Sequence, residues 1–377
     1  MEAVLYIGLS QAFFASFIIA TKKPRCLPDK ILASWLFLIG FEMTISLFML
    51  KIDHFFIPFP ISMLLLITYA PLLFLYVKSL IRENILPSRI DWLHFLPFIL
   101  FLAAYYLFLP GDSVFLVNNY FVQDKSLPFR LAYSIYLFFS VIIYSVLVLL
   151  LISEHQKRLK DQFSYTSQTI TLNWLKIVLF IFVITFLFFI IIGTSFMFQA
   201  TDLDPRWFSR IGLTLFAFAV SYFGIKQPVL FKSNCFAGIT KDDSRKKQKS
   251  KYEKSGLNEE LAKDYSKRLQ HFMKTEKPYL NPELTIKDVS DHLNISRHYI
   301  TQVLNETMKK NFYTFINEYR VQEVKKRLVD HQYDHLTFLA IAYECGFNSK
   351  SSFNFIFKKS TGMTPSEFKK KRMESRQ

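Results

Sequence analysis

The chain has 377 residues, enough for two or three domains. Hydrophobic residues make up 51%, with 42 Phe, and charged residues only 20%, a composition that suggests membrane spans. The net charge of +16 is uneven, because residues 1–225 hold 16 Lys+Arg against 12 Asp+Glu and the rest hold 30 against 18. The three cysteines, Cys26, Cys235 and Cys345, lack ligand spacing, so we expect reduced thiols and neither a disulfide nor a zinc site.

Seven apolar runs in the first 227 residues are each long enough to cross about 30 Å of hydrocarbon. The first run follows Met-Glu and has no basic leader or small-residue cleavage site, so we expect a retained span. The sequence therefore predicts a seven-span transmembrane domain over residues 1–227, with spans near 3–20, 31–50, 61–81, 91–109, 129–152, 173–198 and 208–225.

The basic residues of the predicted loops alternate along the chain. Lysines and arginines gather after the first, third, fifth and seventh runs, whereas the other loops carry few of them. Because basic loops stay in the cytoplasm, this alternation predicts an external N-terminus and a cytoplasmic C-terminus. The longest external loop would be 110–128, too short for a separate sensor domain.

Glu42 is the one acidic residue well inside a predicted span. An intramembrane carboxyl is costly, and it is usually either paired or functional. Two interpretations stay open: a protonated Glu42 hydrogen-bonded to a neighbouring Tyr or backbone group, or a site that senses a ligand or protons.

The composition changes abruptly after Pro228. Residues 228–256 form a basic segment without an apolar stripe, which predicts a flexible linker that lies on anionic lipid or on DNA. Residues 257–280 then predict an amphipathic connecting helix, with Leu257, Leu261, Tyr265 and Leu269 at helical spacing. This helix either packs on the domain that follows or pairs two chains and transmits a signal.

The last hundred residues hold two copies of one pattern, at 286–308 and 338–362. Each copy is an apolar-periodic helix, a sharp turn and a second helix opened by a capping serine, Ser296 or Ser349. Two helices joined at an angle by a short turn make a helix-turn-helix, whose second helix enters the major groove of DNA.

This region resembles the DNA-binding domain of the AraC family of bacterial transcription regulators. The resemblance rests on the tandem repeat, on IAYECGFNSKSSFNFIFKKSTGMTPSEF at 341–368 and on the joining helix FINEYRVQEVKKRLVD at 315–330. It implies a compact all-helical domain over residues 281–372 that places both recognition helices on one face of double-stranded promoter DNA. By family analogy it also implies contact with RNA polymerase, allows a homodimer, and places the spans in a bacterial cytoplasmic (inner) membrane.

Polar residues on the two recognition helices are the predicted DNA contacts, since such side chains bind phosphates and base edges. The chain departs from the family pattern twice: Met308 to Asn311 lacks the usual Gly after the first recognition helix, and Phe355 stands where Arg is common. The predicted residues are Ser296, Arg297, His298, Thr301 and Gln302 in the first unit, and Asn348, Ser349, Lys350, Ser351, Ser352, Asn354 and Lys358 in the second.

The sequence thus predicts an all-α protein: a seven-helix transmembrane bundle and an AraC-like domain with two helix-turn-helix units. Its predicted function is membrane-anchored, sequence-specific transcription regulation, with the bundle anchoring the chain or sensing a small-molecule or membrane signal. The alternative is a membrane transporter or receptor with a regulatory cytoplasmic tail. No phosphate-binding Gly loop, His-Glu metal pair or nucleophile elbow is present, so we predict no enzyme activity, cofactor or metal.

Overall fold

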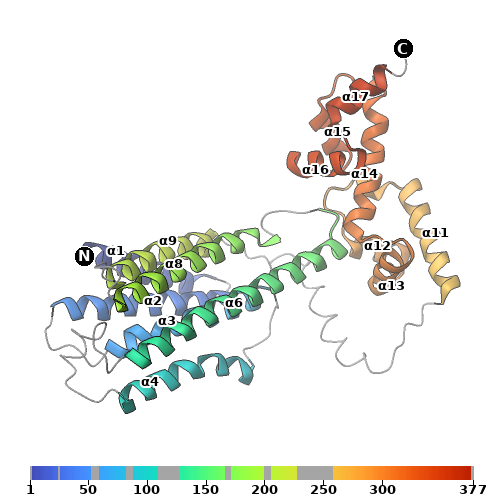
Figure 1. Cartoon of the computed structure of the whole chain (residues 1–377). Coiled ribbons are helices and arrows are strands. Elements are labelled where there is room, and N and C mark those ends of the chain that lie inside the picture. Colours follow the sequence, from blue (N-terminus) through green and yellow to red (C-terminus); the bar gives the residue numbers. More distant parts are fainter. Residues whose placement is uncertain are drawn as a thin grey trace. The chain divides into compact units, whose positions relative to one another are not determined.

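The computed structural model describes residues 2–23, 26–51, 59–81, 88–108, 127–165, 171–198, 205–226 and 258–374 (Figure 1). The chain divides into two compact units: Met1–Ser153 with Leu172–Asp243, and Glu154–Thr171 with Ser244–Gln377. Within the described ranges the regular elements are all helices, so the all-α prediction is confirmed there. The predicted linker 228–256 lies outside them, as does most of the predicted loop 110–128.

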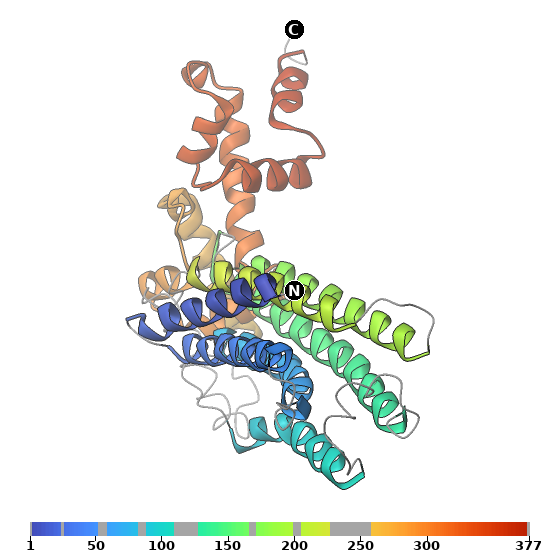
Figure 2. The same cartoon turned by 90° about the vertical axis from the view of Figure 1, so that its left-hand side faces the viewer.

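The first unit is a bundle of long helices (Figure 2). Helix α1 packs on α2 and α9, α2 packs on α3, and α8 packs on α9, while α4 lies at the margin against α3. The elements are α1 (Glu2–Thr21), α2 (Leu27–Lys51), α3 (Phe59–Ile81), η1 (Arg89–Phe95), α4 (Leu96–Phe108), α6 (Leu127–Gln162), α8 (Asn173–Met197) and α9 (Pro205–Lys226).

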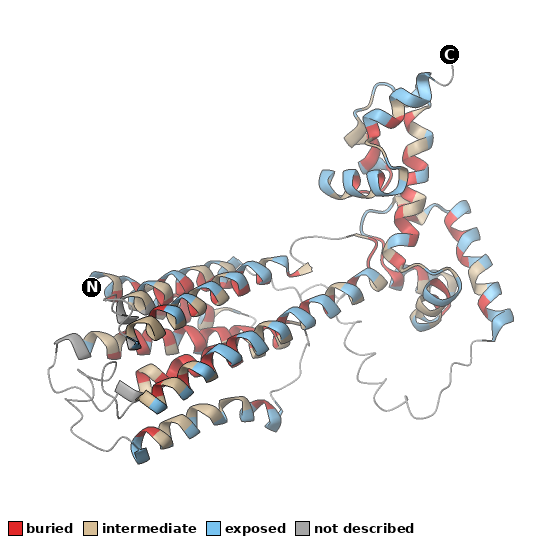
Figure 3. Ribbon diagram, in the orientation of Figure 1, coloured by how far each residue is buried: buried red, intermediate tan, exposed pale blue. Residues whose placement is uncertain are grey.

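Aromatic residues fill the centre of the bundle. Trp35 is fully buried, and its ring contacts those of Tyr69, Phe182 and Phe216 from three other helices. Figure 3 shows exposed positions along the outer sides of these helices. Many are large apolar residues, among them Phe17, which is 66% exposed, and Phe180, which is 64% exposed. A bundle that is apolar on both its inner and outer surfaces suits hydrocarbon surroundings rather than water.

The number of spans differs from the sequence prediction. Among the described residues, six helices are long and apolar enough to cross a membrane, so the count of seven is not confirmed. The seventh predicted run corresponds to α9, which is a helix of 22 residues but carries Arg206, Arg210 and Lys226. The six helices cover Glu2–Thr21, Leu27–Phe48, Ile61–Ile81, Arg89–Phe108, Leu127–Gln162 and Asn173–Phe196.

The second unit is organised around α14, the predicted joining helix (Figure 1). Its first half packs in a core with the first helix-turn-helix, and its second half packs in a separate core with the second. The elements are α11 (Glu259–Thr275), η3 (Pro278–Leu280), α12 (Ile286–Leu293), α13 (Arg297–Gln302), η4 (Val303–Thr307), α14 (Phe312–Leu328), η5 (His331–Tyr333), α15 (Phe338–Glu344), α16 (Lys350–Thr361) and α17 (Pro365–Glu374).

The connecting helix α11 packs on the first helix-turn-helix unit. Leu269 and Met273 are fully buried in that core, and the ring of Phe272 stacks on His292 of α12 with centroids 4.2 Å apart. Of the two interpretations drawn from the sequence, packing on the following domain is the one observed in this chain. Pairing with a second chain stays a prediction.

Candidate DNA-binding surface

Local capping interactions fix where the two helices of the first helix-turn-helix begin and end. Thr285 Oγ1 accepts from the backbone of Asp288 while the Asp288 carboxylate accepts from the backbone of Thr285, which is a capping box at the start of α12. Asn294, with a φ of +51°, ends α12 in the left-handed conformation that Asn tolerates. Ser296 Oγ then accepts from the backbone N–H of Tyr299 and caps α13, the first recognition helix.

The second helix-turn-helix has the same devices with a glycine in the turn. Gly346 has a φ of +91°, and a Cβ built there would lie 2.2 Å from the carbonyl oxygen of Tyr279. Only glycine therefore fits this turn. Ser349 Oγ accepts from the backbone N–H of Ser352 and caps α16, the second recognition helix.

The first recognition helix ends without a glycine, as the sequence predicts. Residues 303–307 form one turn of π-helix, and Lys309 carries the left-handed turn with a φ of +55°. A left-handed non-glycine residue costs about 1–2 kcal/mol. The core residues Val303 and Leu304 hold this end of the helix in place, since both are fully buried.

The predicted contacts on α13 differ in accessibility. Ser296 and His298 are exposed, whereas Arg297, Thr301 and Gln302 are half-buried. The Thr301 hydroxyl donates to the carbonyl of Arg297, and the Gln302 side-chain amide donates to the carboxylate of Glu306 at 2.9 Å. One hydrogen of the Gln302 amide is therefore already donated within the protein.

The predicted contacts on α16 are more accessible. Phe355 adds a ring that is 66% exposed beside them. Ser349 and Ser352 are half-buried at the start of the helix and form the cap, while the exposed residues are Asn348, Lys350, Ser351, Asn354 and Lys358. This helix therefore presents cations, amides and one apolar ring together.

Buried polar residues on α14 support the DNA-binding unit, and the sequence pattern did not identify them. Arg320 is 1% exposed, and its guanidinium donates to the carbonyl oxygens of Tyr279 (2.8 Å) and Asn281 (2.7 Å). Burial lowers the pKa of Arg320 to about 10, so the group is still charged at neutral pH. Helical periodicity alone could not identify this residue, because a long polar side chain on an amphipathic helix usually faces solvent.

The intramembrane acid Glu42 lies in the first unit and is buried. Its carboxylate accepts a hydrogen bond of 2.5 Å from the hydroxyl of Tyr69 on α3. The position therefore combines a carboxyl and a phenol inside the bundle, and the hydrogen bond links α2 to α3.

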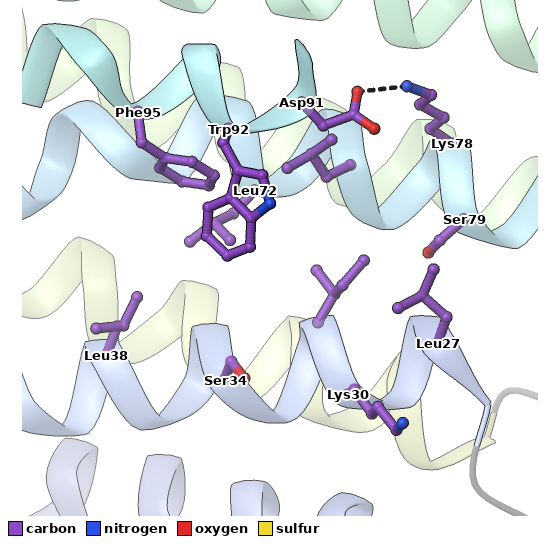
Figure 4. Close-up of a pocket in the computed structure, with 12 residues that line it drawn as sticks. Leu27, Lys30, Ser34, Leu38, Leu72, Lys78, Ser79, Asp91, Trp92 and Phe95 are labelled. Carbon is purple, nitrogen blue, oxygen red and sulfur yellow. Dashed lines mark hydrogen bonds and ion pairs between the residues drawn. The ribbon is translucent and has the colours of Figure 1, made fainter. Parts of the chain in front are cut away.

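A cavity of about 360 Å³ opens between α2, α3 and η1 in the first unit (Figure 4). Trp92 and Phe95 of η1 face Leu38 of α2 across it, and the walls are mostly apolar. Lys78 of α3 forms an ion pair with Asp91 of η1 at the rim. Among the described residues, no group of three His, Cys, Asp or Glu side chains could hold a metal ion.

Comparison with known proteins identifies the second unit. Residues 289–371 match the family model of the helix-turn-helix domain. The chain is 27% identical over 136 residues to an uncharacterised HTH-type transcriptional regulator from the cgkA 5′ region of Pseudoalteromonas carrageenovora; the match covers 36% of this chain and 75% of that protein. It is 31% identical over 94 residues to the melibiose operon regulatory protein of Escherichia coli K12, covering 25% of this chain and 30% of that protein. No solved structure matches the chain.

These matches confirm the AraC-type helix-turn-helix at the C-terminal end of the chain. The matched region contains both recognition helices and all of α14. The chain spans under a third of the length of the melibiose regulator. The family-model match, at residues 289–371, lies outside the apolar helices of the first unit.

Proposed function

We propose that this protein is a membrane-anchored, sequence-specific DNA-binding transcription regulator of the AraC type. The observation that carries the proposal is the presence, in one chain, of an AraC-type helix-turn-helix region and of six helices apolar enough to span a membrane. Residues 1–227 are the membrane domain, 228–256 the basic linker, 257–280 the connecting helix and 281–372 the DNA-binding domain. The bundle anchors the chain and receives a signal, and the protein is not an enzyme.

The DNA contacts proposed for α13 and α16 are the twelve residues identified from the sequence. Support comes from the exposure of His298, Lys350, Asn354 and Lys358, which places donors and cations on the surface of both recognition helices. Arg side chains suit guanine edges and Asn side chains suit adenine edges, whereas lysines suit phosphates. In this proposal α16 supplies most of the affinity and both helices supply base preference.

We propose α9 as a seventh span. It packs on α1 and α8, and Leu213, Phe216 and Val220 on its inner face are buried in the core of the bundle. Its basic residues lie near its two ends, where lysine and arginine side chains can reach the interface. An odd number of spans puts the two ends of the chain on opposite sides of the membrane. The basic loops then place the N-terminus outside and the DNA-binding unit in the cytoplasm, the compartment that holds the chromosome. The membrane is the bacterial cytoplasmic membrane.

DNA binding is tested with the full-length protein in lipid nanodiscs. We expect it to bind duplexes selected from a random pool, with an affinity that falls steeply between 50 and 200 mM salt, about tenfold or more, because lysines and arginines displace condensed counterions. Affinity is measured by fluorescence anisotropy at several salt concentrations. Absence of any selected duplex would reject the regulator and favour a transporter or receptor, which substrate uptake into vesicles would then test.

Orientation is tested with reporter fusions. A fusion after Lys232 is expected to be active only as a cytoplasmic reporter, and a fusion in the 110–128 loop only as an external one, because the basic loops set the orientation. The measurement is the paired activity of alkaline phosphatase and green fluorescent protein at each site. Cytoplasmic activity of the 110–128 fusion would contradict the seven-span topology.

A further inference from the structure

Two residues that follow α6 are buried in the second unit. Phe163 forms an antiparallel bridge with Thr285, the cap of α12. The next residue, Ser164, donates from its backbone N–H to the carbonyl of Leu284 at 3.2 Å, and its hydroxyl donates to the same oxygen at 2.7 Å. Ser164 is 0% exposed and Phe163 is 2% exposed. These residues are therefore part of the folded DNA-binding unit although 120 positions separate Ser164 from Leu284.

The polar groups of Ser164 all have partners. Arg320 donates through Nη1 to the Ser164 carbonyl at 2.8 Å and through Nη2 to its hydroxyl at 2.9 Å. Asn317 Nδ2 donates to the same carbonyl at 3.0 Å. Arg320 and Asn317 are themselves buried, so an unfilled position here would leave buried donors without acceptors. The donors of Arg320 and Asn317 on α14 are thus matched to the carbonyl and hydroxyl oxygens of Ser164.

The same segment reaches the first recognition helix. The side chain of Asp161, in the last turn of α6, is hydrogen-bonded to Asn305. Asn305 lies in η4, which continues directly from α13. Residues 161–164 thus contact the cap of α12, the turn that follows the first recognition helix, and α14. These three parts fix the geometry of the first helix-turn-helix.

Helix α6 connects this segment to the bundle. Its 36 residues span about 54 Å, well over the roughly 30 Å of a hydrocarbon core. We propose that residues 161–165, the docking segment, hold the first helix-turn-helix unit in its DNA-reading geometry and so link that geometry to α6. The inference rests on the proposed function, since it assumes that α6 crosses the membrane and that the second unit binds DNA.

The proposal predicts an effect confined to one half of the DNA site. Ser164 and Phe163 hold α12 and α14, whereas the second helix-turn-helix has a core of its own around Phe353 and Phe357. Ser164 is in this sense a positioning residue. Its loss should loosen base recognition by α13 and leave recognition by α16 as it was.

The docking itself is tested by a disulfide in the full-length protein in nanodiscs. Ser164 and Leu284 lie opposite each other in an antiparallel pair, where Cβ atoms are about 5 Å apart, close to disulfide distance. The double variant Ser164→Cys/Leu284→Cys, with the native cysteines replaced by Ala and a protease site placed in 228–256, should stay joined after cleavage until it is reduced. The control Lys160→Cys/Leu284→Cys should separate. Separation of both pairs would overturn the docking, and this readout does not depend on DNA binding.

The effect on recognition is tested with Ser164→Leu, which places a bulky apolar group against Arg320. In selections from random duplexes we expect discrimination in the first half-site to fall about tenfold, the loss of one base contact, with less than a twofold change in the second. Ser164→Ala should give a smaller effect in the same half, and the exposed Lys160→Leu should give none. Equal losses in both halves, or no loss in either, would overturn the positioning role. If the wild type selects no duplex, the proposed function fails instead, and the disulfide result still decides the docking.

Discussion

Replacing Arg320 by Met is expected to destabilise the second unit by about 3–5 kcal/mol. The guanidinium bonds to carbonyls of Tyr279 and Asn281 and to Ser164, so Met would leave buried acceptors without donors. Arg320→Lys should be nearly as harmful, because an ammonium cannot reproduce the planar fork that reaches three chain segments. Glu318→Met is the matched control, since its side chain is on the same helix and 41% exposed.

The destabilisation is measured by the rate at which the thiol of Cys345 is alkylated. Cys345 is fully buried beside the turn at Gly346, and burial raises the pKa of its thiol to about 12. At pH 8 the thiol is therefore protonated and inaccessible in the native state, and alkylation must wait for the unit to open. In a full-length chain with Cys26 and Cys235 replaced by Ser, Arg320→Met should accelerate labelling more than about a hundredfold. Labelling at the wild-type rate would show that Arg320 does not support the fold.

Single substitutions on the two recognition helices should affect opposite halves of the DNA site. Arg297→Ala is expected to relax base preference in the first half-site, and Asn354→Ala in the second, by about 1–3 kcal/mol for each lost base contact. The reason is the placement of the two side chains on α13 and α16, which belong to different cores joined by α14. Base preferences are measured by sequencing duplexes selected with each variant at two salt concentrations.

Lysines on α16 are the controls for that experiment. Lys350→Ala and Lys358→Ala should weaken binding to all sequences about equally and reduce the salt slope by about one, as the loss of a phosphate contact does. A base preference that changes with Lys350→Ala, or stays intact with Asn354→Ala, would contradict the assignment of roles on this helix.

Much of the fold could be predicted from the sequence because its signals are local. Ser296 and Ser349 cap the recognition helices, Gly346 sits in a turn that only glycine fits, and the apolar stripes of α12 and α16 face their cores. The number of spans could not be predicted from composition alone, for a physical reason. Helix α9 mixes apolar residues with Arg206 and Arg210, so its composition does not distinguish a membrane span from an amphipathic helix packed on the bundle.

The polar contacts within the second unit could not be predicted. The sequence pattern predicts Arg320 and Asn317 to be ordinary surface positions of a helix. It predicts Ser164 to be part of a loop between two spans. Their significance depends on hydrogen bonds across 153 and 156 positions, which no local pattern encodes. Gln302 is half-buried and its amide donates to Glu306 one turn away, and its contact with DNA stays a prediction.

The hydrogen bonds between Arg320 and Ser164 join two residues that are synthesised at different times, and this limits when the DNA-binding unit can finish folding. Ser164 leaves the ribosome 156 residues before Arg320, which at 5–20 residues per second is about 10–30 s. During that interval α8, α9 and α11 to α13 are made, and the docking segment waits with its polar groups in water. The DNA-binding unit can therefore complete its buried hydrogen bonds only onto a segment that is already in place between two helices of the bundle. A chain cut after the docking segment, or one translated from an internal start after it, would make a DNA-binding unit that lacks Ser164 as the acceptor for Arg320 and Asn317.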